Sequence, residues 1–436
     1  MSLSQERKST IAVSLTNFLD SGCIVASSLG LTAWAAAFGF DAGMVSILGA
    51  IGANAFGAAV GALIGGFLTD RFGRTIIYRY NLLVYALGVL LCMIAANPAM
   101  IIIGIVLSGL SVGAGVPASW SYISETSASV HRAANIGISQ FAWSCGPAII
   151  FFLSLIMSFV VTPMVSARIL FLVLFIVALV AWNMQRKLQE SADWAEKNEA
   201  KGEKVSFGRM MGNALKNPIN IKTIVFLVAV YLTWNLAAGT NGQFMPYLYA
   251  AAGNIDATGQ SILGLVQWVL VAVCSLAIFS KLGDKVPHRV LFGVGAFMAL
   301  LSWIAIAVFG ISLTNGTSAS MGWVLWVYVI LWGVSAGFSA QCFYALWGTE
   351  LFPTQYRGGA QGIMFFLVRA ALGVWSLVGV GAIMGDISAN PAGFFPAAVI
   401  MCVVLLISLV VGVVWCPNTQ GKTLDEITKE RYGDQI

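Results

Sequence analysis

Two ionisable residues, Asp20 and Arg369, lie deep inside long apolar segments of this 436-residue chain. A charged side chain at the centre of a membrane helix costs about 2.5–3.5 kcal/mol on insertion scales, so such a residue usually faces a cavity or a charged partner. A carboxyl group that burial keeps out of water can bind and release a proton near neutral pH. We therefore predict that Asp20 binds and releases a proton and faces a water-accessible chamber.

Arg369 has three interpretations. It pairs with Asp20, it binds the acid group of an anionic substrate through its planar guanidinium, or it extends to the lipid headgroups. It follows Arg357 by twelve residues, which is ~18 Å of helix rise. That position near the middle of the membrane argues against the third interpretation. The alternative to proton coupling is a permanent lock between Asp20 and Arg369 or an amide.

Other charged residues recur at the ends of apolar segments. Glu125 precedes Arg132 by seven residues, and Glu350 precedes Arg357 by the same spacing. Carboxylates beside guanidinium groups form charge-assisted hydrogen bonds, so these residues can latch one face closed; the alternative is that they only anchor the interface and set topology. The predicted latch consists of Asp70, Arg71, Arg74, Glu125, Arg132, Asp284, Lys285, Arg289, Glu350 and Arg357.

The elements that must position these residues are membrane helices. The chain is 59% apolar and 9% charged, whereas soluble domains carry about 25% charged residues, so a soluble enzyme, a secreted disulfide domain and a nucleic-acid binder are excluded. Uncharged runs of eighteen or more residues predict spanning helices, because a helix satisfies its own backbone in lipid. The twelve predicted spans are about 11–37, 43–68, 76–96, 99–122, 134–160, 165–184, 222–250, 260–280, 289–312, 322–347, 359–384 and 393–416.

The basic residues indicate the orientation of the chain. With the N-terminus inside, 21 of the 23 Lys and Arg residues fall in cytoplasmic segments, and the outer loops carry Asp41, Asp256 and Asp386. Because Lys and Arg are enriched in cytoplasmic loops, we predict a multi-pass protein of a bacterial-type cytoplasmic (inner) membrane with both termini in the cytoplasm.

The sequence contains no residue spacing that is typical of a metal site or a catalytic centre. The seven cysteines occur singly, without a CxxC or CxxH spacing. His131 and His288 are expected in polar loops, which leaves no histidine for a proton relay inside the membrane. We predict no metal, no cofactor and no enzymatic activity.

An internal repeat divides the chain into two halves. The segment Asp70-Arg71-Phe72-Gly73-Arg74 has a counterpart in residues 281–289, and the Glu125–Arg132 spacing has one in Glu350–Arg357. A parallel repeat implies two similar six-helix bundles with the substrate site between them. We assign residues 1–184 and 222–416 to the bundles, 185–221 to a cytoplasmic linker (helical, or alternatively a disordered tether) and 417–436 to a cytoplasmic tail.

These motifs resemble the sugar porter branch of the major facilitator superfamily (MFS), and the resemblance covers nearly the whole chain. The loop at residues 70–74 is general to the superfamily. Residues 189–194, 350–358 and 417–427 resemble three segments of sugar porters: the motif after the sixth span, the loop after the tenth span and the C-terminal tail. The fold that the resemblance implies is an all-α membrane protein with twelve transmembrane helices in two pseudo-symmetric bundles.

The resemblance also implies substrate-binding positions. Asn241 matches the asparagine that binds sugar hydroxyls, Gln140 matches a glutamine with the same role, and Asn235 falls where another glutamine lies. Amides suit this task because they supply donors and acceptors together; the alternative is that they tie helices together inside a bundle. Trp347 and Tyr344 lie close to the position of the tryptophan that covers the sugar.

One departure concerns the cation beside the predicted proton site. The fourth-span arginine that partners the first-span aspartate in proton-coupled sugar porters is absent, and Ile105 falls at that position. The resemblance nevertheless implies proton-coupled uptake of a sugar or related polyol by alternating access. The alternatives are symport of an anionic metabolite such as a sugar acid bound by Arg369, facilitated diffusion, and a non-transporting nutrient sensor. The expected partners are the small-molecule substrate, the proton and the lipid bilayer, and the protein is expected to be monomeric, without nucleic acid.

Overall fold

The computed structural model describes residues 3–40, 42–199, 206, 208, 212, 215–251, 255, 257–314, 323–378 and 394–433. Within these ranges the chain is helical and has no strand. Twelve segments in them are long and apolar enough to cross a membrane, which confirms the predicted all-α architecture. The outer-loop residues Asp41, Asp256 and Asp386, and much of the linker, lie outside the described ranges.

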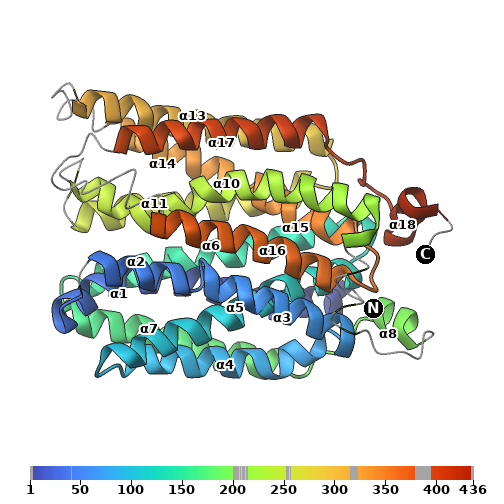
Figure 1. The fold of residues 1–436 in the computed structure, drawn as a ribbon, viewed down its shortest axis with the longest axis horizontal. Coiled ribbons are helices and arrows are strands. Elements are labelled where there is room, and N and C mark those ends of the chain that lie inside the picture. The colour runs from blue at the N-terminus through green and yellow to red at the C-terminus, as the bar shows by residue number, and fades with distance from the viewer. Residues whose placement is uncertain are drawn as a thin grey trace.

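The first six spans form the N-terminal bundle, drawn in the lower half of Figure 1. Long helices arise here because each segment is a nearly continuous apolar run whose backbone must bond to itself in lipid. The helices are α1 (Leu3–Phe38), α2 (Ala42–Ile51), α3 (Phe56–Phe72), α4 (Thr75–Met93), α5 (Pro98–Thr126), the short η1 (Ser129–His131), α6 (Arg132–Met157) and α7 (Pro163–Gln185).

The last six spans form the C-terminal bundle, drawn in the upper half of Figure 1. Helix α16 of this bundle packs directly on α3 of the other, and α6 packs on α11. The helices are α10 (Pro218–Ala251), α11 (Ala257–Cys274), η2 (Ser275–Phe279), α12 (Ser280–Leu282), α13 (His288–Thr314), α14 (Trp323–Ala336), α15 (Ala340–Glu350), α16 (Arg357–Val374) and α17 (Phe394–Val414).

Two predicted spans are broken inside the membrane. The second span was predicted as one helix over 43–68, but it consists of α2 and α3 separated by a turn at Gly52–Ala55. The tenth span likewise divides into α14 and α15 at Gly337–Ser339. A uniformly apolar run does not reveal such a break, because hydropathy measures burial in lipid and not helix continuity. Non-helical backbone at this depth is tolerated where it is buried in protein or lines a cavity.

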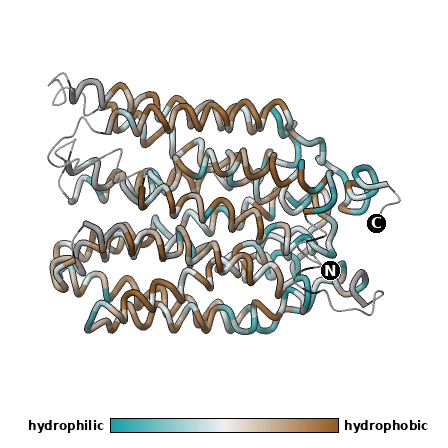
Figure 2. Tube along the Cα trace, viewed as in Figure 1, coloured by the Kyte–Doolittle hydropathy of each residue, from teal (hydrophilic) through white to brown (hydrophobic). Residues whose placement is uncertain are grey.

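Both chain ends lie on one face of the molecule. Figure 2 shows a largely hydrophobic body with hydrophilic residues gathered at the end where the termini lie. The linker helix α8 (Ala192–Glu199) and the tail helix α18 (Leu424–Tyr432) both lie there (Figure 1). The inter-helix loops that carry most of the Lys and Arg residues lie at the same end, and we call this side the basic face.

Candidate transport site and latch

Asp20 and Arg369 meet between the two bundles. The Asp20 carboxylate on α1 lies 3.9 Å from the Arg369 guanidinium on α16, and both side chains are almost fully buried. Trp143 on α6 donates its indole N–H to Asp20 Oδ2 at 3.0 Å. The structure therefore supports the first interpretation of Arg369, and its burial beside a carboxylate rules out extension to the headgroups.

The break in the second span supplies the other partner of Arg369. Asn54 lies in the turn between α2 and α3, and Arg369 Nη1 bonds to both its side-chain oxygen and its backbone carbonyl, the latter at 3.3 Å. Because this turn has left the helical hydrogen-bond pattern, its carbonyl is free to accept from a guanidinium. The ring of Phe365 lies 4.7 Å from the Arg369 guanidinium carbon and covers its apolar face. Arg369 is thus held by both bundles.

A cavity of about 30 Å³ adjoins this pair. Residues of both bundles line it: Ser21, Ile24, Val25, Asn54, Trp143 and Pro147 from one, and Asn235, Ala238, Gly239, Gly242, Trp268, Gln341 and Arg369 from the other. Asp20 is not among them, which corrects the prediction that its carboxyl faces the chamber. Trp143 and Arg369 contact Asp20 and form the wall in front of it.

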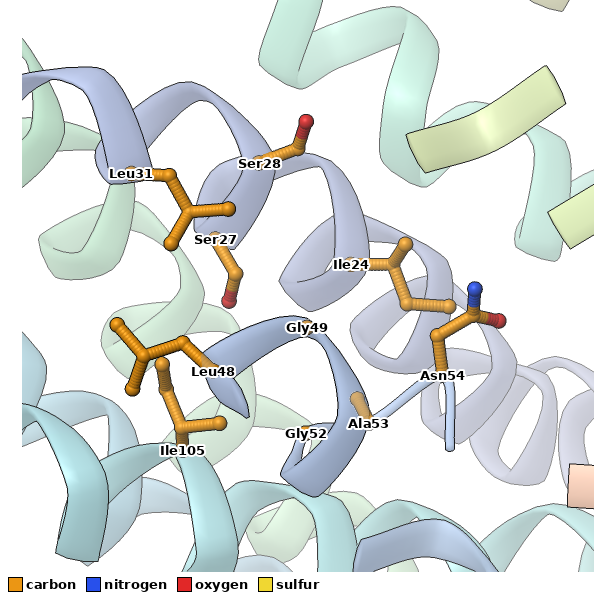
Figure 3. Close-up of a pocket in the computed structure, with 10 residues that line it drawn as sticks. All are labelled: Ile24, Ser27, Ser28, Leu31, Leu48, Gly49, Gly52, Ala53, Asn54 and Ile105. Carbon is orange, nitrogen blue, oxygen red and sulfur yellow. The ribbon is translucent and has the colours of Figure 1, made fainter. Parts of the chain in front are cut away.

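A second cavity of similar size lies beside the first, inside the N-terminal bundle. Figure 3 shows it between α1, α2 and α5, with Ile24 and Asn54 at the edge that the two cavities share. Ile105 lies in its wall, facing Leu48 and Gly52 (Figure 3). The position where sugar porters carry an arginine is therefore apolar here, and the cation beside Asp20 comes from the opposite bundle.

The predicted substrate-binding amides have different places in the structure. Asn235 lines the central cavity, and its side-chain nitrogen has no hydrogen-bond partner among the described residues. Gln140 is buried but outside the cavity wall, and its side-chain nitrogen is likewise unpaired within the described chain. Asn241 is also outside the wall. Its side-chain oxygen accepts a 2.6 Å hydrogen bond from the Tyr328 hydroxyl, which ties α10 to α14.

The two predicted aromatic residues do not line the cavity. Tyr344 stacks on Tyr231 with ring centroids 4.0 Å apart and is fully buried. Trp347 donates its indole N–H to His288 Nδ1 at 3.2 Å, in an aromatic cluster inside the C-terminal bundle. His288 is itself the buried first residue of α13, not a residue of a polar loop as predicted.

The two amides of the cavity region, Asn54 and Gln341, were not singled out as site residues from the sequence. Asn54 and Gln341 contribute amides, and Trp143 and Trp268 form an aromatic pair across the bundles with ring centroids 5.1 Å apart. An asparagine inside a predicted span was the one available signal, because amides are rarely left facing lipid.

Glu125 is the centre of an ion-pair network on the basic face. Its carboxylate accepts from Arg74 Nη2 at 2.6 Å and Nε at 3.1 Å, in a bidentate arrangement. Arg357 of the other bundle donates to the same carboxylate at 2.8 Å. Arg74 also reaches the backbone carbonyl of Thr354 at 3.1 Å. These contacts join the two bundles.

A related arrangement connects the bundles in the opposite sense. Arg132 of the N-terminal bundle lies 2.9 Å from Glu350 of the C-terminal bundle. Asp70 accepts from the backbone N–H groups of Gly358 and Gly359 at the start of α16, at 3.0 and 2.6 Å. Carboxylates at helix N-termini are favourable because free N–H groups and the helix dipole meet there.

Asp284 is the counterpart of Asp70. It accepts from the N–H groups of Ala133 and Ala134 at the start of α6, at 3.1 and 3.0 Å. Burial raises the pKa of the Asp284 carboxyl above its usual value, and these two N–H groups oppose that rise. Burial lowers the pKa of Arg74, but the Glu125 and Asp70 carboxylates outweigh it, so the net pKa lies above the usual value and the guanidinium stays charged.

Three predicted latch residues take no part in these contacts. Arg71 packs over the rings of Phe67 and Phe72. Lys285 and Arg289 are exposed, and neither has an ion pair within the part of the chain that the structure describes. A charged residue in a loop of the basic face joins the latch only if its side chain also points across the interface between the bundles.

The linker contributes a latch contact that the sequence analysis missed. Asp193 on α8 accepts a 3.2 Å hydrogen bond from the Thr354 hydroxyl of the C-terminal bundle. Glu190, just before α8, accepts from the backbone N–H groups of Arg74 and Thr75, both at 3.0 Å. The linker is thus held against both bundles, and the basic face is closed in this structure.

Comparison with known proteins agrees with this architecture. The family model of the Major Facilitator Superfamily matches residues 10–377. The chain belongs to the Major Facilitator Superfamily. MFS proteins are transporters built from two six-helix halves around a midplane site, and the fold and relatives of this chain are those of transporters and not of enzymes.

Individual relatives cover almost the whole chain. The minor myo-inositol transporter IolF of Bacillus subtilis (strain 168) is 38% identical over 432 residues, or 98% of this chain and 94% of that protein. The arabinose-proton symporter of the same organism is 26% identical over 86% of this chain and 84% of its own length. The structure of the proton:xylose symporter XylE matches with a TM-score of 0.79 at 14% identity, over 99% of this chain and 100% of that one. The sugar porter resemblance is thereby confirmed.

Proposed function

We propose that this protein imports a sugar or polyol, of the size and kind of inositol, together with a proton. The observation that carries the proposal is the Asp20–Arg369 pair, an ionisable carboxylate and its cation held between two bundles that must move apart during transport. We take the basic face to be cytoplasmic, since it carries the loops rich in Lys and Arg.

The chemistry of the cavity favours a neutral, hydroxyl-rich ring. Asn54, Asn235 and Gln341 present amides from three elements, and each can bind neighbouring hydroxyls as donor and acceptor. Trp143 and Trp268 present apolar surface for the C–H side of such a ring. The name of IolF, to which this chain is 38% identical, agrees with a cyclic polyol.

The position of the Asp20–Arg369 pair supports proton coupling. With Asp20 ionised, its attraction to Arg369 joins α1 to α16 across the interface. A proton on Asp20 removes that attraction, and Arg369 then remains bound to Asn54 by hydrogen bonds. Movement of Trp143 and Arg369, which form the wall in front of Asp20, opens the route between the carboxyl group and the cavity. Binding a proton thereby frees the bundles to rearrange around the substrate.

The second candidate, symport of a sugar acid, keeps a specific role for Arg369. The guanidinium lies in the cavity wall and its Nε has no hydrogen-bond partner among the described residues. However, its other nitrogens already bind Asn54 and lie beside Asp20. An anionic substrate would have to compete with a carboxylate that is already in place, so we favour the neutral substrate.

The decisive experiment is uptake by proteoliposomes under an imposed pH gradient. We expect myo-inositol or a neutral sugar to accumulate above its external concentration when the outside is acidic. We expect this accumulation to fall to the equilibrium level when a protonophore is added. Uptake that only reaches equilibrium, with or without the gradient, would contradict symport and support facilitated diffusion. Stronger uptake of a sugar acid such as glucuronate would support the second candidate, and binding without uptake of any compound would support a sensor.

A further inference from the structure

A groove of about 500 Å³ opens where α10, α17 and α18 meet at the basic face. Much of its wall is apolar and faces outward: Ile221 and Val225 on α10 and Trp415 after α17 are 41%, 58% and 62% exposed. Residues 218–242 of α10 form a membrane span, and tryptophan is typical of the membrane–water boundary. This wall therefore lies against the edge of the bilayer.

Two cationic side chains line the same groove. Lys222 is exposed and makes no ion pair within the described residues. Arg431 donates from Nη2 to the Thr223 hydroxyl, while its Nε is shielded from solvent and has no hydrogen-bond partner in the described chain. The described residues that line the groove include no carboxylate. The groove thus combines two basic side chains with an apolar wall.

The fold holds Arg431 in this position. The hydroxyl of Tyr432, the next residue, shares its single proton between Asn220 Oδ1 at 2.6 Å and the carbonyl of Leu351 at 3.1 Å. These bonds fix the end of α18 over the start of α10, within one turn of Lys222. Arg431 therefore forms a fixed part of the groove.

We propose that this groove binds an anionic phospholipid of the leaflet on the basic face, with the phosphate between Lys222 and Arg431 and the first part of the acyl chains along Val225 and Trp415. Basic residues at the membrane surface attract anionic headgroups, and the apolar wall adds contacts that a free anion cannot make. The groove lies apart from the central cavity, and the two share no lining residue.

The test is native mass spectrometry of the full-length protein in detergent, titrated with phosphatidylglycerol or phosphatidylethanolamine of identical acyl chains. We expect phosphatidylglycerol to bind more tightly, and the double variant Lys222→Gln/Arg431→Gln to weaken its binding by about thirtyfold, as expected for two basic residues near a headgroup. The matched control Lys187→Gln/Arg79→Gln removes one exposed lysine and one exposed arginine at the N-terminal bundle, and it should change the affinity less than twofold.

Each other outcome overturns the proposal. Equal binding of the two lipids, or equal losses in the groove and control variants, would indicate unspecific attraction to the surface. Displacement of the lipid by millimolar inorganic phosphate would indicate a site for a free anion. If the double variant does not fold, Lys222→Gln alone and the charge-conserving Arg431→Lys replace it. The proposal then requires the first to lose affinity and the second to retain most of it.

Discussion

The carboxyl group of Asp20 has neighbours from two helices besides its own. Trp143 on α6 donates to one oxygen, Arg369 on α16 lies beside it, and Asn54 between α2 and α3 holds the guanidinium. An ion pair within one bundle would move as a unit when the bundles rock. This pair connects the bundles, so the charge on Asp20 acts directly on the interface.

The variant Asp20→Asn tests this role. The amide cannot ionise, so we expect sugar or polyol accumulation against a gradient to be lost and exchange of labelled for unlabelled substrate to remain. Uptake by the wild type should rise as the external pH falls, because protons drive it, whereas uptake by the variant should not change with pH. Accumulation that persists in Asp20→Asn would exclude proton coupling through this residue.

The variant Arg369→Gln distinguishes a neutral substrate from a sugar acid. In Arg369→Gln the Asp20 carboxyl loses its cation, which favours the protonated form and hinders proton release. We expect accumulation of a neutral substrate to fall at least tenfold while its binding affinity changes less than threefold. Arg369→Lys, which keeps the charge, should retain part of the accumulation. Selective loss of sugar-acid binding in Arg369→Gln would instead assign the residue to the substrate.

At the scale of elements, opening of the basic face requires the helix ends of the two bundles to separate there. Each bundle presents a carboxylate to the start of a helix in the other: Asp70 to α16 and Asp284 to α6. The ion pairs of Glu125 with Arg357 and of Glu350 with Arg132 lie beside these contacts. Because all four contacts cross between the same two bundles, they should break together when this face opens.

Glu125→Gln should weaken the closed state. The substitution leaves Arg74 and Arg357 buried without their shared carboxylate, and breaking a buried pair in this way typically costs about 3–5 kcal/mol. We expect faster hydrogen–deuterium exchange in residues 121–139 and 345–362, which form the closed face. Lys285→Gln is the control, since the Lys285 ammonium makes no ion pair in the described structure. Equal exchange in the two variants would argue that Glu125 only sets topology.

At the scale of the whole molecule, closure depends on a close approach of α3 and α16. A Cβ atom built on Gly66 would lie 2.5 Å from the backbone oxygen of Gly358 and 3.1 Å from the Cα of Gly362. Such a separation is too short for any side chain, so glycine at this position allows the bundles to touch. The cavity of about 30 Å³ between them has room for water but not for a sugar ring, so substrate entry requires the bundles to separate on one side.

Gly66→Ala should therefore shift the molecule toward opening of the basic face. The distance between spin labels at the exposed positions Asn183 on α7 and Lys281 on α12, one on each bundle, should lengthen in a larger fraction of molecules. Gly293→Ala is a suitable control, because a Cβ there meets only the Val413 side chain at 3.3 Å. An unchanged distance distribution in Gly66→Ala would mean that the helices absorb the methyl group without separating.

The sequence alone determined the spans, the face on which the basic loops gather, and the depth of Asp20 and Arg369, because hydropathy and charge act locally along each segment. It also indicated the repeat that places Glu125 and Arg132 in one half and Glu350 and Arg357 in the other. The tertiary structure decided which side chains meet: Asn54 binds Arg369 at a helix break that hydropathy does not reveal, while Asn241 and Trp347 turn into the C-terminal bundle. The rotation of each helix about its axis determines such contacts, and in an apolar segment surrounded by lipid and protein that rotation is set by packing against the other helices.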